Sequence, residues 1–266
     1  MADALTEIYQ VRRRHLDEEM AREPLVELQS RAQSSTEARR SLSAALACAR
    51  PPALIAEIKR ASPSAGLIAQ EFDPAEIAAT YQSAGADAIS VLTEEDHFQG
   101  HLGFLQVVRS RTTLPLLRKD FLTTPYEAAQ SAAYGADAIL AIVAGLTDGQ
   151  LTGLLGAARE WRLEVLVEVH SAVELGRAVA LGASLLGINN RDLRSLRTDP
   201  GVTEKLIGMV PPGIQVVSES GFQTAPQIER IFRLGVPSFL VGEALMRSDD
   251  KAGWVAAVKA HGRVGD

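Results

Sequence analysis

The chain has 266 residues, of which 46% are hydrophobic and 23% charged, and its formal net charge is −6. An acidic globular chain of this kind is not expected to present a nucleic-acid-binding surface or a basic membrane anchor. The single cysteine, Cys48, cannot form an internal disulfide, and the charged N-terminus has no signal-type apolar core. We therefore expect a reducing, cytoplasmic setting, and no apolar run is long enough to span a bilayer.

The first 50 residues predict a helical extension. Three apolar side chains lie at helical spacing on one stripe: Leu5, Ile8 and Val11. A second helix is predicted over residues 36–49, where Pro51 and Pro52 end it. Cys48 in this helix is expected to pack as a small apolar side chain. The predicted organisation is an N-terminal extension over residues 1–50 that packs on a catalytic barrel over residues 51–266, as one structural domain.

From residue 53 onward, short strand-like runs alternate with stretches that are compatible with helices. The runs cover residues 53–58, 86–92, 115–118, 137–143, 164–169, 184–189, 214–218 and 237–241. Such alternation predicts parallel strands that are joined by helical crossovers.

A weak internal repeat supports a closed arrangement of these strands. The sequence Gly-Ala-Asp-Ala-Ile at residue 85 recurs at residue 135, and looser echoes begin at Gly182 and Gly235. Each of these glycines is expected to end a helix just before a strand. Two strand–helix units in each of four repeats predict an α/β fold, the (β/α)8 TIM barrel. A doubly wound open sheet is the alternative, weakened because no Gly-x-Gly-x-x-Gly sequence follows the first strand.

Catalytic groups in such barrels come from the carboxyl ends of the strands. Polar or charged residues follow seven of the eight predicted strands, and only the fourth ends without a charge. Four charged residues come directly after an apolar run: Glu57, Lys59, Lys119 and Glu168. A single charge at a strand end is usually solvated, but four at one rim indicate a site that moves protons.

Turns after the last two strands have a different chemical character. They contain Ser220-Gly221 and Gly242-Glu243. Barrels often bind phosphate at this place through backbone N–H groups, and glycine lets the backbone approach an oxyanion closely. Either glycine alone could simply form a tight turn, but the two together favour a phosphate site.

Other residues carry weaker signals. His97 and His101 lie four residues apart without an evident third ligand, so no metal site is expected. His170 is expected to be a solvated histidine of the rim. Phe98 and Phe121 lie near strand ends, where core packing and an aromatic wall for a substrate are the two interpretations. The residues thus predict an enzyme that acts on a phosphorylated small molecule without a metal or nucleotide cofactor.

Seven segments resemble the indole-3-glycerol phosphate synthase family in order and spacing. They are residues 56–64, 91–94, 117–121, 166–170, 187–193, 218–221 and 241–247. The resemblance implies a carboxy-lyase of tryptophan biosynthesis. Its expected reaction closes a ring on 1-(2-carboxyphenylamino)-1-deoxyribulose 5-phosphate, releasing CO2 and water and leaving indole-3-glycerol phosphate. No cofactor, nucleic acid or membrane is implied, and a weak association with other enzymes of the pathway is left open.

The resemblance also implies roles for individual residues. Lys119 would protonate the developing alkoxide, while Lys59 with Glu57, and Glu168, would serve the later acid and base steps in an order left open. The two lysines would need lowered pKa values or would act as charged donors. Asn189 and Arg191 would orient the substrate, with Arg191 near its carboxylate. The remaining expected binding residues are Ser62, Phe98, Glu219, Ser220, Gly221, Gly242 and Glu243.

Two rival functions remain open at this point. A Schiff-base aldolase or sugar-phosphate isomerase on the same barrel would use Lys59 or Lys119 as a nucleophile. A barrel that only binds a partner enzyme would have no use for strand-end acids and bases. His97 and His101 depart from the family pattern, which has an aromatic residue before Phe98 and a small hydroxyl residue at the second place.

Overall fold

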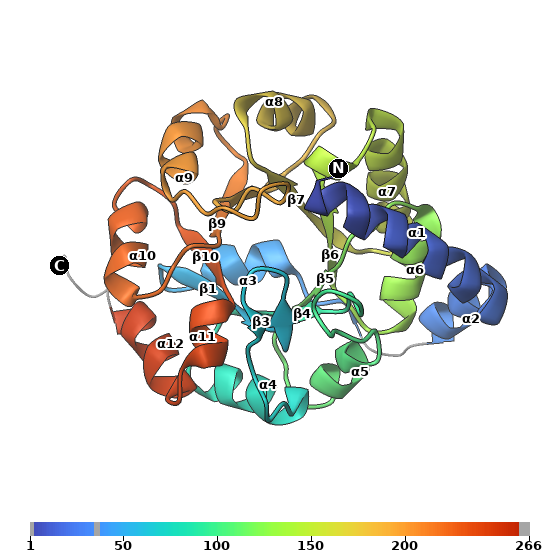
Figure 1. Ribbon diagram of the computed structural model, residues 1–266, viewed down its shortest axis with the longest axis horizontal. Coiled ribbons are helices and arrows are strands. Elements are labelled where there is room, and N and C mark those ends of the chain that lie inside the picture. The colour runs from blue at the N-terminus through green and yellow to red at the C-terminus, as the bar shows by residue number, and fades with distance from the viewer. Residues whose placement is uncertain (1–2, 35–37, 261–266) are drawn as a thin grey trace.

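The computed structural model describes residues 3–34 and 38–260, and its centre is a closed barrel of eight parallel strands (Figure 1). The strands are β1 (Ala53–Ile58), β4 (Ala88–Leu92), β5 (Leu116–Lys119), β6 (Ala138–Ile142), β7 (Glu164–Val169), β8 (Leu185–Asn189), β9 (Gln215–Glu219) and β10 (Ser238–Val241). β1 pairs with β4 on one side and with β10 on the other, which closes the ring. The predicted TIM barrel is therefore confirmed, and the open-sheet alternative is wrong.

Helices surround the barrel as an outer ring (Figure 1). They are α4 (Pro74–Ser83), α5 (Phe104–Arg109), α6 (Pro125–Ala133), α7 (Asp148–Glu160), α8 (Ala172–Ala180), α9 (Gly201–Leu206), α10 (Ala225–Phe232), α11 (Glu243–Arg247) and α12 (Lys251–Ala260), with short 3-10 turns η1 (Val143–Gly145) and η2 (Ile207–Met209). The repeated glycines at 85, 135, 182 and 235 all have positive φ. They end helices just before strands, as the repeat predicted.

The period of the strands decides which side chains face the interior. On β1, Leu54 and Ala56 belong to the cluster between strands and helices, whereas Ala53 and Ile55 belong to the cluster inside the barrel. Because successive strand residues point to opposite faces, Glu57 shares the inward face of Ala53 and Ile55. The alternation along β1 therefore places the Glu57 carboxylate inside the barrel, at the carboxyl end of the strands.

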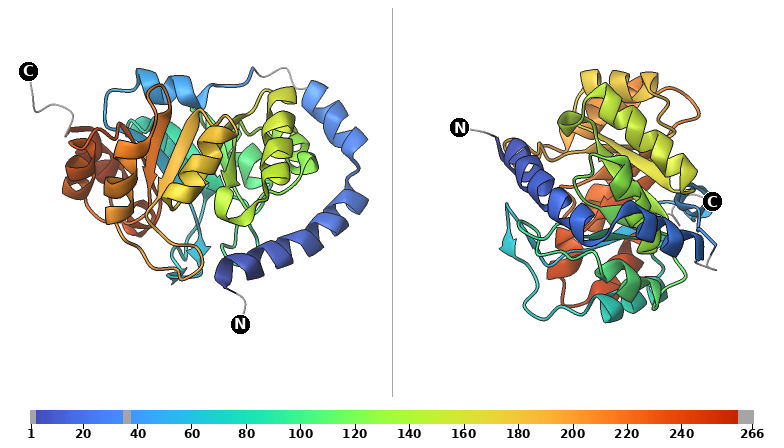
Figure 2. Two further views of the ribbon diagram at one scale, coloured as in Figure 1. Left: turned by 90° about the horizontal axis from the view of Figure 1, so that it is seen from above. Right: turned by 90° about the vertical axis from the view of Figure 1, so that its right-hand side faces the viewer.

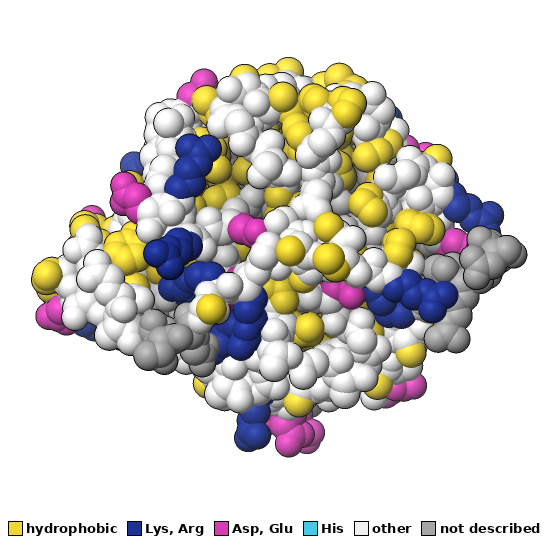
Figure 3. Space-filling view, turned by 180° about the vertical axis from the view of Figure 1, so that it is seen from behind, with side chains coloured by type: hydrophobic (Ala, Val, Ile, Leu, Met, Phe, Trp, Pro, Cys, Tyr) yellow, Lys and Arg dark blue, Asp and Glu magenta, His cyan; other side chains and the backbone are white. Residues whose placement is uncertain are grey.

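The N-terminal helices contact both ends of the barrel. Helix α1 (Ala4–Arg22) crosses the end that carries the β2–β3 hairpin (Ala61–Ser62 and Gly66–Leu67), and α2 (Leu25–Ser34) follows it (Figure 2). Helix α3 (Leu42–Cys48) lies at the opposite end, which Figure 3 shows with charges of both signs on its surface. Among the described residues, no helix is long and apolar enough to cross a membrane.

Two details of this extension differ from the sequence prediction. The buried stripe of α1 continues from Ile8 to Arg12, while Val11 is only half-buried. The helix predicted over 36–49 begins at Leu42, because the Ser41 side chain caps it by accepting from the Ala44 N–H at 3.0 Å. Residues 36 and 37 lie outside the described residues. Cys48 is exposed rather than packed.

Candidate active site

A cavity opens at the carboxyl end of the strands, and every predicted catalytic and binding residue lines it. These residues are Glu57, Lys59, Ser62, Phe98, Lys119, Glu168, Asn189, Arg191, Glu219, Ser220, Gly221, Gly242 and Glu243. Helix α1 adds Ile8 to the apolar side of the cavity, and Leu193 and Leu196 add to it from the segment after β8. The barrel thus collects side chains from distant parts of the chain in one place.

Glu57 and Lys59 form an ion pair with 2.6 Å between Lys59 Nζ and Glu57 Oε1. The Glu57 side chain is buried, and that of Lys59 is mostly buried. Gly242 of the neighbouring strand end is part of the reason, because a Cβ atom at this position would overlap Glu57 Oε1. The sequence assigned Gly242 to phosphate binding alone, but its lack of a side chain also makes room for the acid.

Lys119 lies between two buried carboxylates. Its Nζ donates to Glu168 Oε2 at 2.9 Å and to Glu219 Oε2. Burial alone would lower the pKa of Lys119, but Glu168, Glu219 and Glu57 outweigh it and raise the pKa above its ordinary value. Of the two alternatives left open for this lysine, the charged donor is therefore the one that the geometry supports. A lysine held in this charged state is also a poor nucleophile for a Schiff base.

The pKa values of Glu168 and Glu219 are shifted in opposite directions, although both carboxyl groups contact the same lysine. Burial would raise the pKa of Glu168, but Lys119 and His170 hold it well below its ordinary value. Burial, reinforced by the negative charges of Glu168 and Glu57, raises the pKa of Glu219 to about 7 against the effect of Lys119. Two carboxyl groups with separated pKa values can hold different protonation states at neutral pH, as acid–base catalysis requires.

An aromatic wall covers one side of the cavity. The ring centroids of Phe98 and Phe121 are 6.0 Å apart, and Tyr9 of α1 meets Phe121 edge-on at 5.6 Å. Glu94 fixes the loop that carries Phe98 by accepting from the Phe98 N–H at 3.0 Å. The wall therefore joins three separate segments of the chain.

The two histidines of this loop have different carboxylate neighbours. His97 Nδ1 lies 2.9 Å from Glu94 Oε1, whereas His101 is exposed and its Nε2 lies 3.8 Å from Glu95. Within residues 3–34 and 38–260, no group of His, Cys, Asp and Glu side chains is placed to hold a metal ion.

The predicted phosphate side contains strained backbone. Ser220 has a φ of 65° and Gly221 a φ of 87°, and Asn190 Nδ2 donates to the Ser220 carbonyl at 3.1 Å. Arg191 bridges the cavity mouth by donating to Ser64 Oγ, and it lies 3.5 Å from a carboxylate oxygen of Glu243. A positive φ at a residue other than glycine is uncommon and is often found at functional sites.

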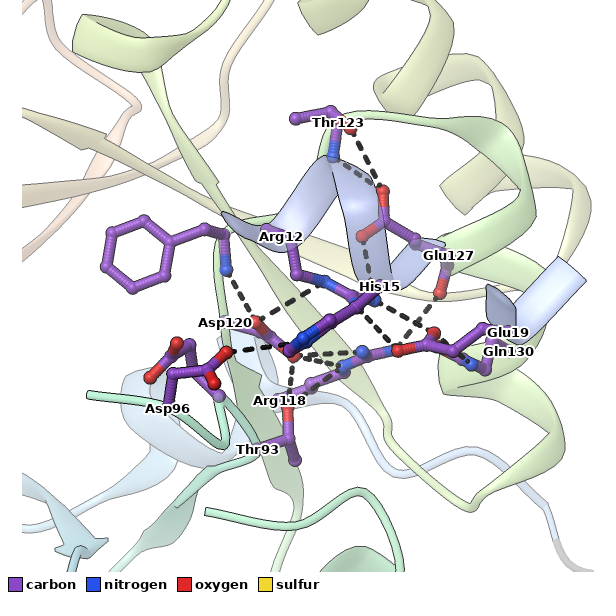
Figure 4. Close-up of polar contacts among 12 residues, drawn as sticks. Arg12, His15, Glu19, Thr93, Asp96, Arg118, Asp120, Thr123, Glu127 and Gln130 are labelled. Atoms are coloured by element: carbon purple, nitrogen blue, oxygen red, sulfur yellow. Dashed lines mark hydrogen bonds and ion pairs between the residues drawn. The ribbon is translucent and has the colours of Figure 1, made fainter. Parts of the chain in front are cut away.

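A second group of buried charges lies behind Lys119, and the sequence analysis did not find it. We call it the Arg12 network, and it consists of Arg12, Glu19, Arg118, Asp120 and Glu127 (Figure 4). Arg12 lies 2.6 Å from Glu19 Oε1, 3.0 Å from Glu127 Oε1 and 3.9 Å from Asp120 Oδ1. Arg118 donates to Asp120 Oδ2 at 2.9 Å. The helical spacing of Arg12 from Ile8 was the one signal in the sequence that pointed to its burial.

His170 is another departure from the sequence prediction. Instead of being solvated, its ring is largely buried, 3.3 Å from Glu168 Oε1 and 3.2 Å from Glu174 Oε2. Burial lowers its pKa, but the neighbouring carboxylates of Glu168 and Glu174 outweigh this and raise the pKa to about 10. The histidine is therefore an imidazolium at neutral pH.

Comparisons with known proteins agree on one family. The family model described as indole-3-glycerol phosphate synthase matches residues 5–258. A protein of that name from Rhodospirillum rubrum is 43% identical over 261 residues, which cover 97% of this chain and 99% of the relative. One from Rhizorhabdus wittichii is 45% identical over 255 residues, covering 95% and 96%.

Solved structures with lower identity share the barrel. A 3-hexulose-6-phosphate synthase from Salmonella typhimurium superposes with a TM-score of 0.64 at 14% identity, covering 79% of this chain and 97% of its own. A thiamine phosphate pyrophosphorylase from Pyrococcus furiosus gives 0.63 at 17%, covering 81% and 99%. At such identities the likeness concerns the fold alone.

Proposed function

Because the chain belongs to the indole-3-glycerol phosphate synthase family, we propose that the residues around Lys119 divide the acid and base steps of this reaction among themselves. The enzyme is a carboxy-lyase of tryptophan biosynthesis. It converts 1-(2-carboxyphenylamino)-1-deoxyribulose 5-phosphate into indole-3-glycerol phosphate, CO2 and water. The observation that carries the assignment is the placement of Lys119 between the buried carboxylates of Glu168 and Glu219, in the cavity that also contains the Glu57–Lys59 pair.

In the first step, the ring carbon that bears the carboxylate attacks the sugar carbonyl. A new carbon–carbon bond forms, and the carbonyl oxygen becomes an alkoxide that needs a proton. We assign this proton to Lys119, whose Nζ is buried and charged beside its two carboxylates. The carbon–carboxylate bond then breaks, CO2 leaves, and its electron pair restores the ring.

In the second step, the hydroxyl group leaves as water and a proton is lost from the adjacent carbon. We assign the acid for the leaving hydroxyl to Lys59, which Glu57 holds at 2.6 Å. We assign the base to Glu168, because its carboxylate lines the cavity and is paired with Lys119, so that it is ionised and within the site. Glu219, with its pKa near 7, holds Lys119 and takes no separate step.

Binding is assigned by the chemistry of the cavity walls. Phe98, with Phe121 behind it, would contact the aromatic ring, and Asn189 and Arg191 would orient the substrate. The phosphate would lie near Ser62 and the two turns at Ser220-Gly221 and Gly242-Glu243. We further propose one structural domain with residues 1–50 as its extension, a cytoplasmic setting, and at most weak association with other enzymes of the pathway.

Indole fluorescence tests this assignment directly. In buffer with a chelator, the purified enzyme should convert the named substrate into equal molar amounts of CO2 and indole-3-glycerol phosphate, the latter measured by its indole fluorescence. Borohydride added during turnover should trap no covalent adduct. An adduct would favour the Schiff-base alternative, and loss of turnover in the chelator would contradict a reaction that needs no metal.

A further inference from the structure

The environment of Glu168 contains one group that the reaction scheme does not use. The two carboxylate oxygens of Glu168 have different cationic neighbours: Lys119 Nζ at 2.9 Å from Oε2 and His170 Nε2 at 3.3 Å from Oε1. Only 1% of the Glu168 side chain is exposed. A buried carboxylate of this kind depends on both neighbours for its charge and its orientation.

His170 is itself held from its other side. Its Nδ1 lies 3.2 Å from Glu174 Oε2, and the same oxygen accepts from the backbone N–H of His170 at 2.8 Å. Glu174 reaches back in this way because Ser171 caps α8 and places Glu174 in the first turn. The ring is thus anchored at one nitrogen while the other faces the carboxylate of the active site.

We propose that His170, anchored by Glu174, is a positioning residue that orients Glu168 and keeps it ionised for its role as base. The proposal rests on the role given to Glu168 above. Glu168 uses one oxygen for Lys119 and the other for His170, so that neither oxygen can rotate toward the other's partner without losing an ion pair. His170 touches no reacting atom in this scheme.

Charges from all neighbouring elements act on this pair. The charge of Glu168 also raises the pKa of Glu219 of β9 and that of the Tyr9 hydroxyl of α1. His170 interacts with Asp192 after β8 as well as with Glu168 and Glu174. Lys119 and His170 are the cations that hold the pKa of Glu168 down. Without the imidazolium, the pKa of Glu168 should rise, and the acid limb of the rate profile should move to higher pH.

The test compares His170→Asn with the parent enzyme. We expect kcat to fall about 10- to 100-fold with KM within about twofold, as for other residues that orient a catalytic group. The acid limb of kcat should move up by about one pH unit. Glu174→Gln, which keeps the ring but weakens its anchor, should give a smaller shift in the same direction.

Thr147→Ala is the matched control, because it removes the side-chain cap of another helix, α7, without removing a charge and without touching the Glu174 anchor. It should lower the melting temperature and leave the acid limb in place. An unmoved acid limb in His170→Asn would overturn the proposal, and so would an equal shift in Thr147→Ala. Glu168→Gln separates this outcome from a failure of the proposed function: if that variant keeps normal turnover, Glu168 is not the base.

Discussion

Two groups of buried charges flank β5, and each combines three carboxyl groups with two basic side chains. The cavity group has three carboxylates and two lysines: Glu57, Glu168, Glu219, Lys59 and Lys119. The Arg12 network has three carboxylates and two arginines. Yet the pKa of Glu219 in the first group is raised, whereas those of Glu19 and Asp120 in the second are lowered.

The type of cation and the supply of other donors explain this difference. A guanidinium spreads several N–H donors over a plane, while an ammonium is a compact charge. In the Arg12 network, Asp120 also accepts from Thr93 Oγ1 at 2.5 Å, and Glu127 accepts from the N–H groups of residues 123 and 124. The arginines therefore keep the carboxyl groups of Glu19 and Asp120 ionised. In the lysine group, one carboxyl, that of Glu219, titrates near neutral pH.

The largest expected effect is on Lys119. Lys119→Met should lower kcat by roughly 10³-fold, the middle to upper part of the range for a general acid, with little change in substrate affinity or in the circular dichroism spectrum. Lys119→Arg is the informative partner variant, because it keeps the charge in a group that does not release its proton. Turnover close to normal in either variant would contradict the acid role.

Arg12→Met should affect stability far more than chemistry. Removal of one partner from a buried ion pair costs about 3 to 5 kcal/mol of unfolding free energy, because Asp120 and Glu127 would lose a charge partner. We expect kcat to fall by less than the roughly 100-fold that loss of a general acid gives. Arg109→Met, at a largely buried arginine that pairs with Asp137 and does not line the cavity, is the matched control.

Arg12→Met could instead lose as much kcat as Lys119→Met while keeping its stability in urea. That result would contradict the view that the cavity group serves catalysis and the Arg12 network serves stability. Equal losses of stability in the Arg12 and Arg109 variants, with activity kept in both, would support it.

The smallest predicted effect concerns the pH dependence of stability. The native protein keeps the Glu219 proton up to about pH 7, whereas an unfolded glutamate loses it near 4.5. Between these values the native state binds more protons, so the contribution of Glu219 lowers stability as the pH rises. Glu219→Gln removes this slope. Relative to the parent, the variant should gain on the order of 3 kcal/mol from pH 4.5 to pH 8, measured by urea unfolding.

Glu160→Gln, at an exposed end of α7, removes a carboxyl group of the same type outside the cavity and serves as the control. A parallel pair of stability curves for Glu219→Gln and the parent would show that Glu219 titrates normally.

Sequence periodicity was sufficient to predict the barrel, because strands and helices each impose a regular spacing on the apolar residues of the chain. It also located Glu57, Lys59, Lys119 and Glu168 at the rim, since the position of a strand end follows from the strand. The contacts between these residues and side chains of other strands could not be predicted in this way. The distance between Lys119 and Glu219 depends on closure of the ring, and no local pattern carries it.

Two residues illustrate the limit more sharply. Arg12 and His170 both belong to residue types that are usually solvated. Each is buried only because carboxylates from other elements surround it: Asp120 and Glu127 for Arg12, and Glu168 for His170. Burial of a charge is a property of its neighbours in space, and a sequence gives only its neighbours along the chain.

The contacts of the first helices set an order for biosynthesis. The Tyr9 ring lies so close to Gly145 that a side chain there would overlap it, and the Ser43 carbonyl accepts from Gln215 Nε2 at 3.1 Å. A ribosome delivers the chain from its N-terminus, so these helices are made well before the strands on which they rest. They must remain undocked during most of translation. These helices are synthesised before the barrel strands but complete their contacts late, once the two ends of the barrel exist.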